Sequence, residues 1–167
     1  MSPKGNNEVI YPFGHTTIPS SQIVMTSRLS YVAVNIKPVV PYHLLVIPKR
    51  QGTSRLYDLT CDETADLFNL AKKAQRLVEQ VRGVKSSTIA IQDGEDAGQT
   101  VKHVHVHVLP REKDDFAEND DIYSELAKHD QPNAETRRII GYHRSLEDME
   151  KEAEILRQYM QENEDKF

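Results

Sequence analysis

Three histidines alternate with valines in a short run, and they are the residues of this sequence best suited to chemistry. The run covers residues 103–108 and reads HVHVHV. In an extended strand alternate side chains share a face, so the imidazoles would line one face and the valines the other. Neighbouring imidazoles on such a strand lie ~6.5 to 7 Å apart. We therefore expect one face of this strand to join a hydrophobic core and the other to carry a site.

Two kinds of site use histidines with this spacing. Histidines two residues apart on a strand can bind zinc together, and a catalytic zinc usually needs a further protein ligand from elsewhere. The carboxylates just upstream, Glu95 and Asp96, fall in a loop rather than on an adjoining strand. Alternatively, the central histidine, His105, acts as a nucleophile while its neighbours donate hydrogen bonds to an anionic substrate. The spacing alone leaves both kinds of site open.

A polar loop with two glycines leads directly into the histidine run and favours the second kind. Gly94 and Gly98 allow the backbone to approach a ligand closely, and consecutive amide N–H groups in such a turn can surround phosphate oxygens. Gln99 and Thr100 add uncharged donors at the junction. An ordinary turn between two strands would also explain the glycines. Their position before a row of histidines nevertheless points to phosphate chemistry.

The elements that must position these groups can be predicted from composition and periodicity. Segments rich in β-branched and aromatic residues predict four strands, at residues 29–35, 43–47, 88–92 and 101–109. The first two are joined by the short link PVVP, which predicts an antiparallel pair.

Three helices are predicted beside these strands. Apolar residues at steps of three and four predict a main amphipathic helix that begins after Thr60, with Glu63 at capping-box spacing, and stops at Gly83. A short helix is predicted at residues 119–128, and a final helix at residues 145–160.

The distribution of charge separates two parts of the chain. The 167 residues carry a net charge of −5 and 38% hydrophobic residues, as expected of one globular domain. Residues 1–111 hold 13 basic and 9 acidic residues, a net charge of +4, whereas residues 112–167 hold 8 and 17, a net charge of −9. An excess of four positive charges is too small for a nucleic-acid groove but suits a small anionic ligand. The polar, acidic stretch 112–144 is expected to be a mobile or partly ordered loop.

Cysteine content and hydropathy indicate the cellular compartment in which the protein is expected. The single cysteine, Cys61, cannot form an internal disulfide or a cysteine zinc cluster, which favours a reducing compartment. No apolar run approaches the ~20 residues that span a bilayer, and the N-terminal residues lack the apolar stretch of a signal peptide. We expect a cytoplasmic location, or a nuclear one, and no membrane partner.

Several longer segments resemble a known family. The segment HVHVHVL has the His-φ-His-φ-His-φφ signature, with φ apolar, of the histidine triad superfamily. The segments NIKPVVPYH, QDGEDAGQTV and NDDIYSEL resemble its Fhit branch, the dinucleoside triphosphate hydrolases, and in particular fungal members. The resemblance implies an α+β fold of the histidine triad type, with an antiparallel sheet of about five strands, one long helix and a C-terminal helix. It also implies a homodimer.

The resemblance implies a division of the chain. Residues 1–12 would form an N-terminal extension and residues 13–111 the catalytic core. Residues 112–144 would form the acidic segment and residues 145–167 the C-terminal helix, all within a single domain.

The activity implied by the resemblance is hydrolysis of bis(5′-adenosyl) triphosphate to AMP and ADP through a nucleotidyl-histidine. His105 matches the family nucleophile: its Nε2 attacks the α-phosphorus while its Nδ1–H donates to the carbonyl of His103. His107 matches a phosphate-contacting position. The phosphate cradle corresponds to the Gln99 side chain and the backbone of Gly98, Thr100 and Val101.

Other matched positions concern the nucleoside and the metal. Asn35 matches a ribose-binding residue, Gln92 a further substrate contact, and His43 a histidine that supports the triad from a neighbouring strand. The apolar slot for the nucleobase corresponds to Phe13, Ile18 and Leu45. A divalent cation, Mg²⁺ or Mn²⁺, is expected to accompany the polyphosphate substrate, with no metal bound by the protein itself.

Two residues depart from the family pattern or invite a second interpretation. Tyr42 stands where the family has glycine, so either the turn differs here or the family glycine occupies an ordinary conformation. Tyr123 matches a tyrosine that is phosphorylated in animal members, and we interpret it here as a partly exposed aromatic residue.

Three other functions share the triad. A phosphoramidate hydrolase of the Hint branch is disfavoured by Gln99 and by the long acidic segment. Nucleotidyl transfer is disfavoured because relatives with that activity usually replace the third histidine, here His107, by glutamine. A nucleotide-binding signalling module with slow turnover stays open. Neither the preferred number of phosphates nor the preferred base can be read from these residues.

Overall fold

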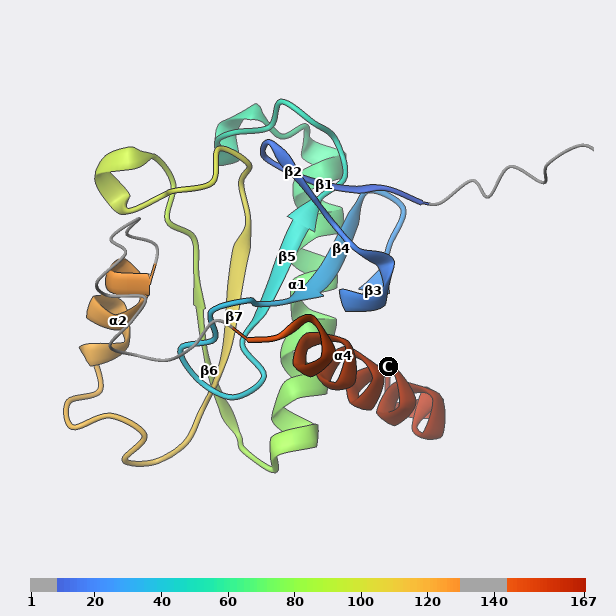
Figure 1. Ribbon diagram of the computed structural model, residues 1–167, viewed down its shortest axis with the longest axis vertical. Helices are drawn as coiled ribbons and strands as arrows, with labels where there is room; N and C mark the ends of the chain where they lie inside the picture. Colours follow the sequence, from blue (N-terminus) through green and yellow to red (C-terminus); the bar gives the residue numbers. More distant parts are fainter. Residues whose placement is uncertain (1–8, 130–143) are drawn as a thin grey trace, which may run out of the picture.

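The protein forms a five-stranded antiparallel sheet, a small two-stranded sheet, and helices on and around them (Figure 1). The computed structural model describes residues 9–129 and 144–167. The large sheet has the strand order β3-β4-β5-β7-β6. Its strands are β3 (Ile23–Thr26), β4 (Ser30–Val34), β5 (Leu44–Pro48), β6 (Ser86–Ala90) and β7 (Val106–Arg111). The small sheet pairs β1 (Tyr11–Phe13) with β2 (Thr16–Ile18). The helices are α1 (Cys61–Arg82), α2 (Asp121–His129) and α4 (Leu146–Glu162).

This architecture confirms the predicted α+β fold, including the long helix and the C-terminal helix. None of the described helices is long and apolar enough to cross a membrane.

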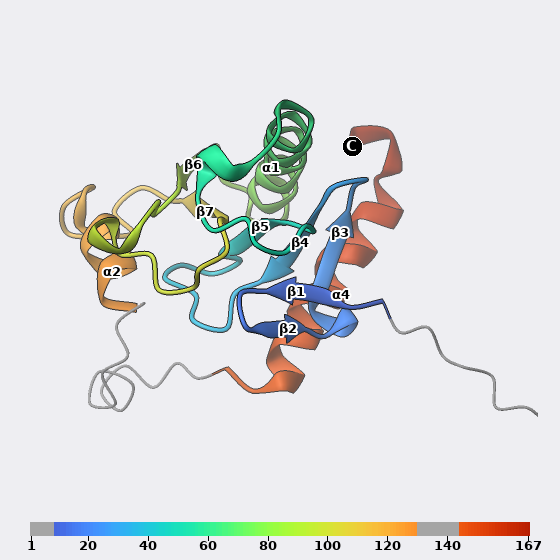
Figure 2. The same cartoon turned by 90° about the horizontal axis from the view of Figure 1, so that it is seen from above.

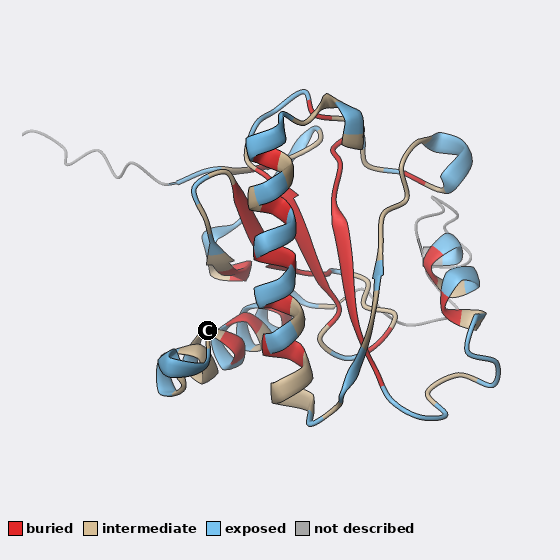
Figure 3. Ribbon diagram, turned by 180° about the vertical axis from the view of Figure 1, so that it is seen from behind, coloured by how far each residue is buried: buried red, intermediate tan, exposed pale blue. Residues whose placement is uncertain are grey.

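The main hydrophobic core lies between one face of the sheet and the two long helices. Figure 3, seen from the helix side, shows α1 lying across strands whose residues are buried. In-register valines from three strands, Val32, Val46 and Val106, form part of this core. Over them pack apolar residues of α1 and α4, namely Leu67, Leu70, Ala71, Ala74, Leu77, Val78, Met149, Ala153 and Leu156.

Helix α1 begins and ends where its sequence predicts. The Thr60 side chain accepts a hydrogen bond from the Glu63 N–H (3.2 Å), and Glu63 accepts one from the Thr60 N–H (2.9 Å). Arg50 donates two further hydrogen bonds to the same carboxylate, which lowers the pKa of Glu63 to about 2. Gly83 closes the helix with a left-handed φ of 68°. The predicted capping box and glycine stop are therefore confirmed.

The opposite face of the sheet is partly covered by the hairpin β1–β2 (Figure 2). This face bears a second apolar cluster, in which Tyr11, Phe13 and Ile18 of the hairpin pack against residues of the sheet. Those sheet residues are Ile23, Tyr31, Ala33, Leu45 and Ile47. The strands β1, β2 and β3 were not predicted from the sequence. The hairpin matters for function because it brings Phe13 and Ile18 over the face that carries the histidines.

The prediction of a continuous strand from residue 101 to 109 is wrong in its extent. β7 begins only at Val106 and runs through Pro110 to Arg111. The preceding segment bonds to loops instead: His103 N–H donates to the Val101 carbonyl, and Val104 N–H donates to the carbonyl of Thr53. Pro110 is tolerated because pairing with β5 ends at Val108, so β6 is the strand that pairs with β7 there.

The predicted short helix at 119–128 corresponds to α2. Its buried residues Ile122 and Leu126 pack on Val40 and Leu109. Arg111 fixes the loop before it, with Nε 2.7 Å from one oxygen of Asp115. Within the stretch that the sequence predicts to be mobile, residues 130–143 lie outside the described residues, so that expectation stays a prediction.

Tyr42 adopts the left-handed conformation, with a φ of 61°. This conformation normally favours glycine, since a Cβ there crowds the backbone. The ring of Tyr42 is partly buried against the main core, and this contact offsets part of the strain. The turn thus keeps a conformation suited to glycine although a tyrosine occupies it.

Candidate active site

His107 lies on the face of the sheet opposite α1, whereas Val106 and Val108 on either side of it point into the main core. The predicted two-faced alternation is confirmed for this part of the run. The ring of His105 stands 5.0 Å from that of His107, centroid to centroid and edge to face. His43, just before β5, has its ring 5.1 Å from His107 on the other side. These three rings form one row.

His103 holds the row in place and has no free ring nitrogen. Its Nε2 lies 2.7 Å from the carbonyl oxygen of Pro48, which can only accept, so Nε2 carries the proton. Its Nδ1 accepts a hydrogen bond from the Gly14 N–H at 3.3 Å. His103 thereby ties the β1–β2 hairpin to the end of β5. A Cβ at Gly14, whose φ is 61°, would stand 2.8 Å from Val101, so glycine is needed for this approach.

His105 presents an unprotonated Nε2. Its Nδ1 lies 2.8 Å from the carbonyl oxygen of His103, which confirms the predicted hydrogen bond and fixes the proton on Nδ1. The side chain is 5% exposed. Burial lowers the pKa of His105 below its ordinary value, because the charged imidazolium would lose its hydration. At neutral pH the ring is therefore a neutral base with a lone pair on Nε2.

His107 differs from His105, because its Nε2 carries a proton and is a hydrogen-bond donor. The Val39 N–H donates to His43 Nδ1 (3.1 Å), so His43 carries its proton on Nε2 and donates it to His107 Nδ1 (2.9 Å). The His107 proton is therefore on Nε2. This atom is buried and has no hydrogen-bond partner among the described residues. Burial, with a smaller effect of His105, lowers the pKa of His107 to about 3. Within the described residues, the neutral His107 thus has an N–H donor without an acceptor, and it lies beside the neutral nucleophile His105.

These two histidines line a cleft of about 440 Å³, a volume typical of a small-molecule site. Eight of the predicted site residues lie together in its wall: Phe13, Ile18, Asn35, Leu45, Thr100, Val101, His105 and His107. The Phe13 ring meets that of His105 edge to face at 5.1 Å. Asn35 is tied to the row, with Nδ2 3.4 Å from His43 Nδ1, the unprotonated nitrogen of that ring. The apolar slot and the histidines thus share one cleft.

Sequence reasoning missed other residues of this wall. They are Thr16, Thr17, Pro19 and Gln22, which surround the small hairpin, Val34, Ile36 and Lys37 at and after the end of β4, and Leu146 and Met149 of α4. The hairpin was not predicted, and the apolar residues of α4 looked like ordinary core. No local sequence signal marks these positions.

The side chain of Gln99 holds the glycine loop before the histidines through three hydrogen bonds. Its Oε1 accepts from the Gly94 N–H (2.8 Å), and its Nε2 donates to the carbonyls of Ser54 (2.7 Å) and Val101 (3.1 Å). The predicted role of this amide was a contact with phosphate. In the structure its hydrogen-bonding capacity serves to close the loop.

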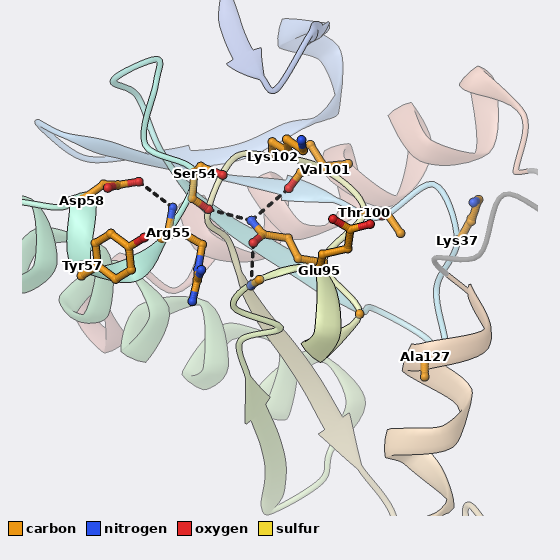
Figure 4. A pocket seen from close by; sticks show the side chains of 13 residues that line it. Lys37, Ser54, Arg55, Tyr57, Asp58, Glu95, Thr100, Val101, Lys102 and Ala127 are labelled. Atoms are coloured by element: carbon orange, nitrogen blue, oxygen red, sulfur yellow. Dashed lines mark hydrogen bonds between the residues drawn. The ribbon is translucent and has the colours of Figure 1, made fainter.

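A second, wider cavity of about 1060 Å³ lies on the other side of this loop. Thr100 and Val101 line both cavities. Figure 4 shows Arg55 and Tyr57 toward one end of the second cavity and Lys37 and Ala127 toward the other. The remaining lining residues include Gly94, Gly98, Gln99 and Lys102. Asp58 and Glu95 also line the second cavity, so the loop separates an apolar cleft from a wider cavity of mixed charge.

Three predicted site residues, His43, His103 and Gln92, line neither of these two cavities. Gln92 lies next to the glycine loop. Its amide packs beneath Gly98, whose φ is 88° and where a Cβ would stand 2.8 Å from Gln92 Nε2. Its Oε1 is buried without a hydrogen bond in the described part of the chain. Gln92 supports the loop from below.

The zinc alternative can be judged from the donor atoms. Both ring nitrogens of His103 are in hydrogen bonds, and the proton on His107 Nε2 leaves that atom no lone pair. Over residues 9–129 and 144–167, no group of three His, Cys, Asp or Glu side chains is arranged to hold a metal ion. The histidine row thus suits nucleophile and donor better than a set of metal ligands.

Known proteins show the same combination of fold and motif. A family model described as HIT domain matches residues 16–114. The chain is 43% identical to the bis(5′-nucleosyl)-tetraphosphatase (asymmetrical) of Schizosaccharomyces pombe, over 87% of this chain and 92% of that protein. It is 45% identical to the bis(5′-adenosyl)-triphosphatase of Dictyostelium discoideum, over 92% and 95%.

A solved structure agrees with these two relatives. The crystal structure of Plasmodium falciparum diadenosine triphosphate hydrolase in complex with cyclomarin A matches with a TM-score of 0.74 and 29% identity, over 96% of this chain and 90% of that one. With the histidine row and the five-stranded sheet, these similarities confirm the predicted resemblance: the chain belongs to the HIT domain family.

Proposed function

We propose that this protein hydrolyses bis(5′-adenosyl) triphosphate to AMP and ADP through a covalent nucleotidyl intermediate on His105. The observation that carries the proposal is the pairing of a lone pair on His105 Nε2 with an unpartnered N–H on His107 in one buried cleft. The names of the two similar relatives, both hydrolases of dinucleoside polyphosphates, support the substrate class.

In the first step His105 Nε2 attacks the α-phosphorus, a P–N bond forms and the P–O bond to the leaving ADP breaks. The His107 N–H donates to a phosphate oxygen, where negative charge accumulates. The imidazole becomes cationic when it is nucleotidylated. Its Nδ1–H already donates to the His103 carbonyl, whose dipole stabilises that charge.

In the second step water attacks the phosphorus, the P–N bond breaks, and AMP leaves. The water proton passes to solvent, and His105 returns to its neutral form. We propose that Asn35 binds the ribose and that Phe13, Ile18 and Leu45, which line the same cleft, enclose the base.

The backbone of the glycine loop offers a place for the phosphates. The N–H groups of Thr100 and Val101 donate no hydrogen bond within the described residues, and both residues line the two cavities. We propose that the polyphosphate crosses this loop, with the first nucleoside in the cleft and the leaving nucleotide in the wider cavity. Mg²⁺ or Mn²⁺ would accompany the phosphates without a cage of protein ligands.

A tetraphosphate is the second candidate substrate, because the name of the S. pombe relative specifies one and the second cavity is wide. Product analysis separates the two: AMP with ADP identifies the triphosphate reaction, and AMP with ATP the tetraphosphate reaction. In both, His105→Ala should abolish turnover. The matched control is His15→Ala, an exposed histidine outside the cleft. The proposal fails if His105→Ala hydrolyses the substrate as fast as the wild-type protein.

We further propose a homodimer in the cytoplasm or nucleus. β6 is an edge strand of the large sheet, and its Ile89 is 40% exposed. An open strand edge with an apolar side chain is a common surface for self-association. Light scattering of the purified protein would give the mass of one or of two chains.

A further inference from the structure

Gln22 is a buried polar side chain that the proposed reaction does not use. It is 6% exposed and lines the same cleft as His105. Its carboxamide makes no hydrogen bond within the described parts of the chain. A polar group in the wall of a cleft is hydrogen-bonded by water or by a ligand, and a ligand that displaces the water has to supply the partners. An unpartnered carboxamide that faces a cavity therefore points to a ligand.

Gln22 lies at the end of the cleft that is farther from the nucleophile His105. It directly precedes Ile23, which pairs with Ala33 on β4. Ala33 pairs with Leu45 on β5, and Leu45 pairs with His107 on β7. A single row of residues thus crosses the sheet, and its ends are three strand spacings apart, ~14 Å. A nucleotide with its phosphate at the histidines would extend its base along this row.

The backbone on both sides of Gln22 is fixed by helix α4. Ser21 donates a hydrogen bond from its hydroxyl to Glu150 (2.8 Å). Arg157 donates to the carbonyls of Ser21 (3.1 Å) and Ile23 (2.7 Å). Gln22 is thus the last residue of an anchored turn, so its side chain is presented to the cleft from a rigid support.

The other buried polar side chains of the cleft wall have partners or roles. Asn35 accepts from the Lys37 N–H and contacts His43, while His105 and His107 belong to the reaction. Thr16, on the hairpin, is exposed, and its hydroxyl donates to the Phe13 carbonyl. Among the described buried side chains of this wall, Gln22 is therefore the one available to bind the edge of a base.

A carboxamide presents one donor and one acceptor side by side. Adenine offers the complementary pair, an amino donor next to a ring-nitrogen acceptor, and glutamine recognises adenine by this pair in nucleic-acid complexes. We propose that Gln22 binds the edge of the adenine base and sets the base preference of the enzyme. This inference rests on the proposed function, since it assumes that the cleft holds a nucleoside.

Two substitutions test it. Gln22→Leu removes both hydrogen-bonding groups at similar size, and Gln22→Glu keeps acceptors but no donor. Gln161→Leu and Gln161→Glu, at an exposed position on α4, are the matched controls. The substrates are diadenosine and diguanosine triphosphate. The amino group is probed separately, by the binding of AMP and of purine riboside 5′-monophosphate, which lacks it.

We expect Gln22→Leu to lower kcat/KM for diadenosine triphosphate about tenfold, mainly through KM, and to lower AMP affinity far more than purine riboside monophosphate affinity. Gln22→Glu should shift the adenine-to-guanine ratio of kcat/KM about tenfold toward guanine, whose ring N–H and amino group both donate. Unchanged ratios in the Glu variant, or equal losses for both monophosphates in the Leu variant, would overturn the inference. If the wild-type protein hydrolyses neither substrate, the proposed function has failed, and AMP against GMP binding by the Glu variant still decides the base preference.

Discussion

The apolar cleft and the glycine loop handle hydrogen bonding in opposite ways. In the cleft, two side chains have unused groups within the described part of the chain: the buried N–H of His107, and the carboxamide of Gln22, a residue that is 6% exposed and lines the cleft. In the loop, the Gln99 side chain is fully bonded, and the backbone N–H groups of Thr100 and Val101 are left unused. The cleft is therefore built to recognise a ligand through side chains, and the loop through its backbone.

Among the substitutions that test this comparison, replacement of His107 should have the largest effect on catalysis. His107→Ala removes the side-chain donor beside the nucleophile, and we expect kcat to fall roughly 10²- to 10³-fold, as for loss of one donor to a developing oxyanion. AMP binding should change far less, since the donor acts mainly on the reacting phosphate. His15→Ala is the control. An unchanged kcat would show that the unpartnered N–H is not used.

Gln99 tests the other half of the comparison. Gln99→Glu loses the donors to the Ser54 and Val101 carbonyls, so we expect the free energy of unfolding to fall by about 2 kcal/mol. Because the loop then loses its shape, kcat should fall with it. Urea unfolding and steady-state kinetics measure the two effects. Unaltered stability with a reduced kcat would instead assign the amide to phosphate binding, as the sequence resemblance implies.

The smallest expected effect is on the pH dependence of the free energy of unfolding. An unfolded histidine has a pKa of about 6.5, and burial lowers that of His107 to about 3. The unfolded chain therefore binds protons first as the pH falls, and stability is lost between pH 6.5 and about 3. His107→Gln should remove about 1.4 kcal/mol of this loss per pH unit below 6.5. Unfolding at pH 7.0 and 5.5 measures the slope. If the free energy of unfolding falls equally per pH unit in wild type and in His107→Gln, then His107 is not a buried neutral histidine.

Local patterns in the sequence predicted those helices and strands whose signals lie in their own residues or directly beside them. Helix α1 has its capping box and its glycine stop in adjacent residues, and the histidine-valine alternation needs only a strand. The strands β1 and β2 are three residues each, too short for a periodic pattern. The start of β7 was wrong because hydrogen bonds to distant loops, such as that from Val104 to Thr53, end the ladder early.

Within the site, residue types were predictable but their protonation and partners were not. The proton on His107 Nε2 depends on the Val39 N–H, which reaches it through His43. Gln22 is notable only because α4, more than a hundred residues later, fixes its backbone and closes the cleft. Such groups are recognised only once distant segments have been brought together.

The central claim is that His105 Nε2 becomes nucleotidylated, and reactions quenched in an alkaline denaturant, in which the P–N bond to imidazole is stable, test it most directly. Protein mixed with radiolabelled diadenosine triphosphate, quenched within one turnover and digested, should yield a labelled adenylyl group on the peptide that contains residues 103–108, attached at His105. His105→Ala should yield no label, and His15→Ala the same amount as wild type. Turnover by wild type without label on His105, or label on another residue, would contradict the account.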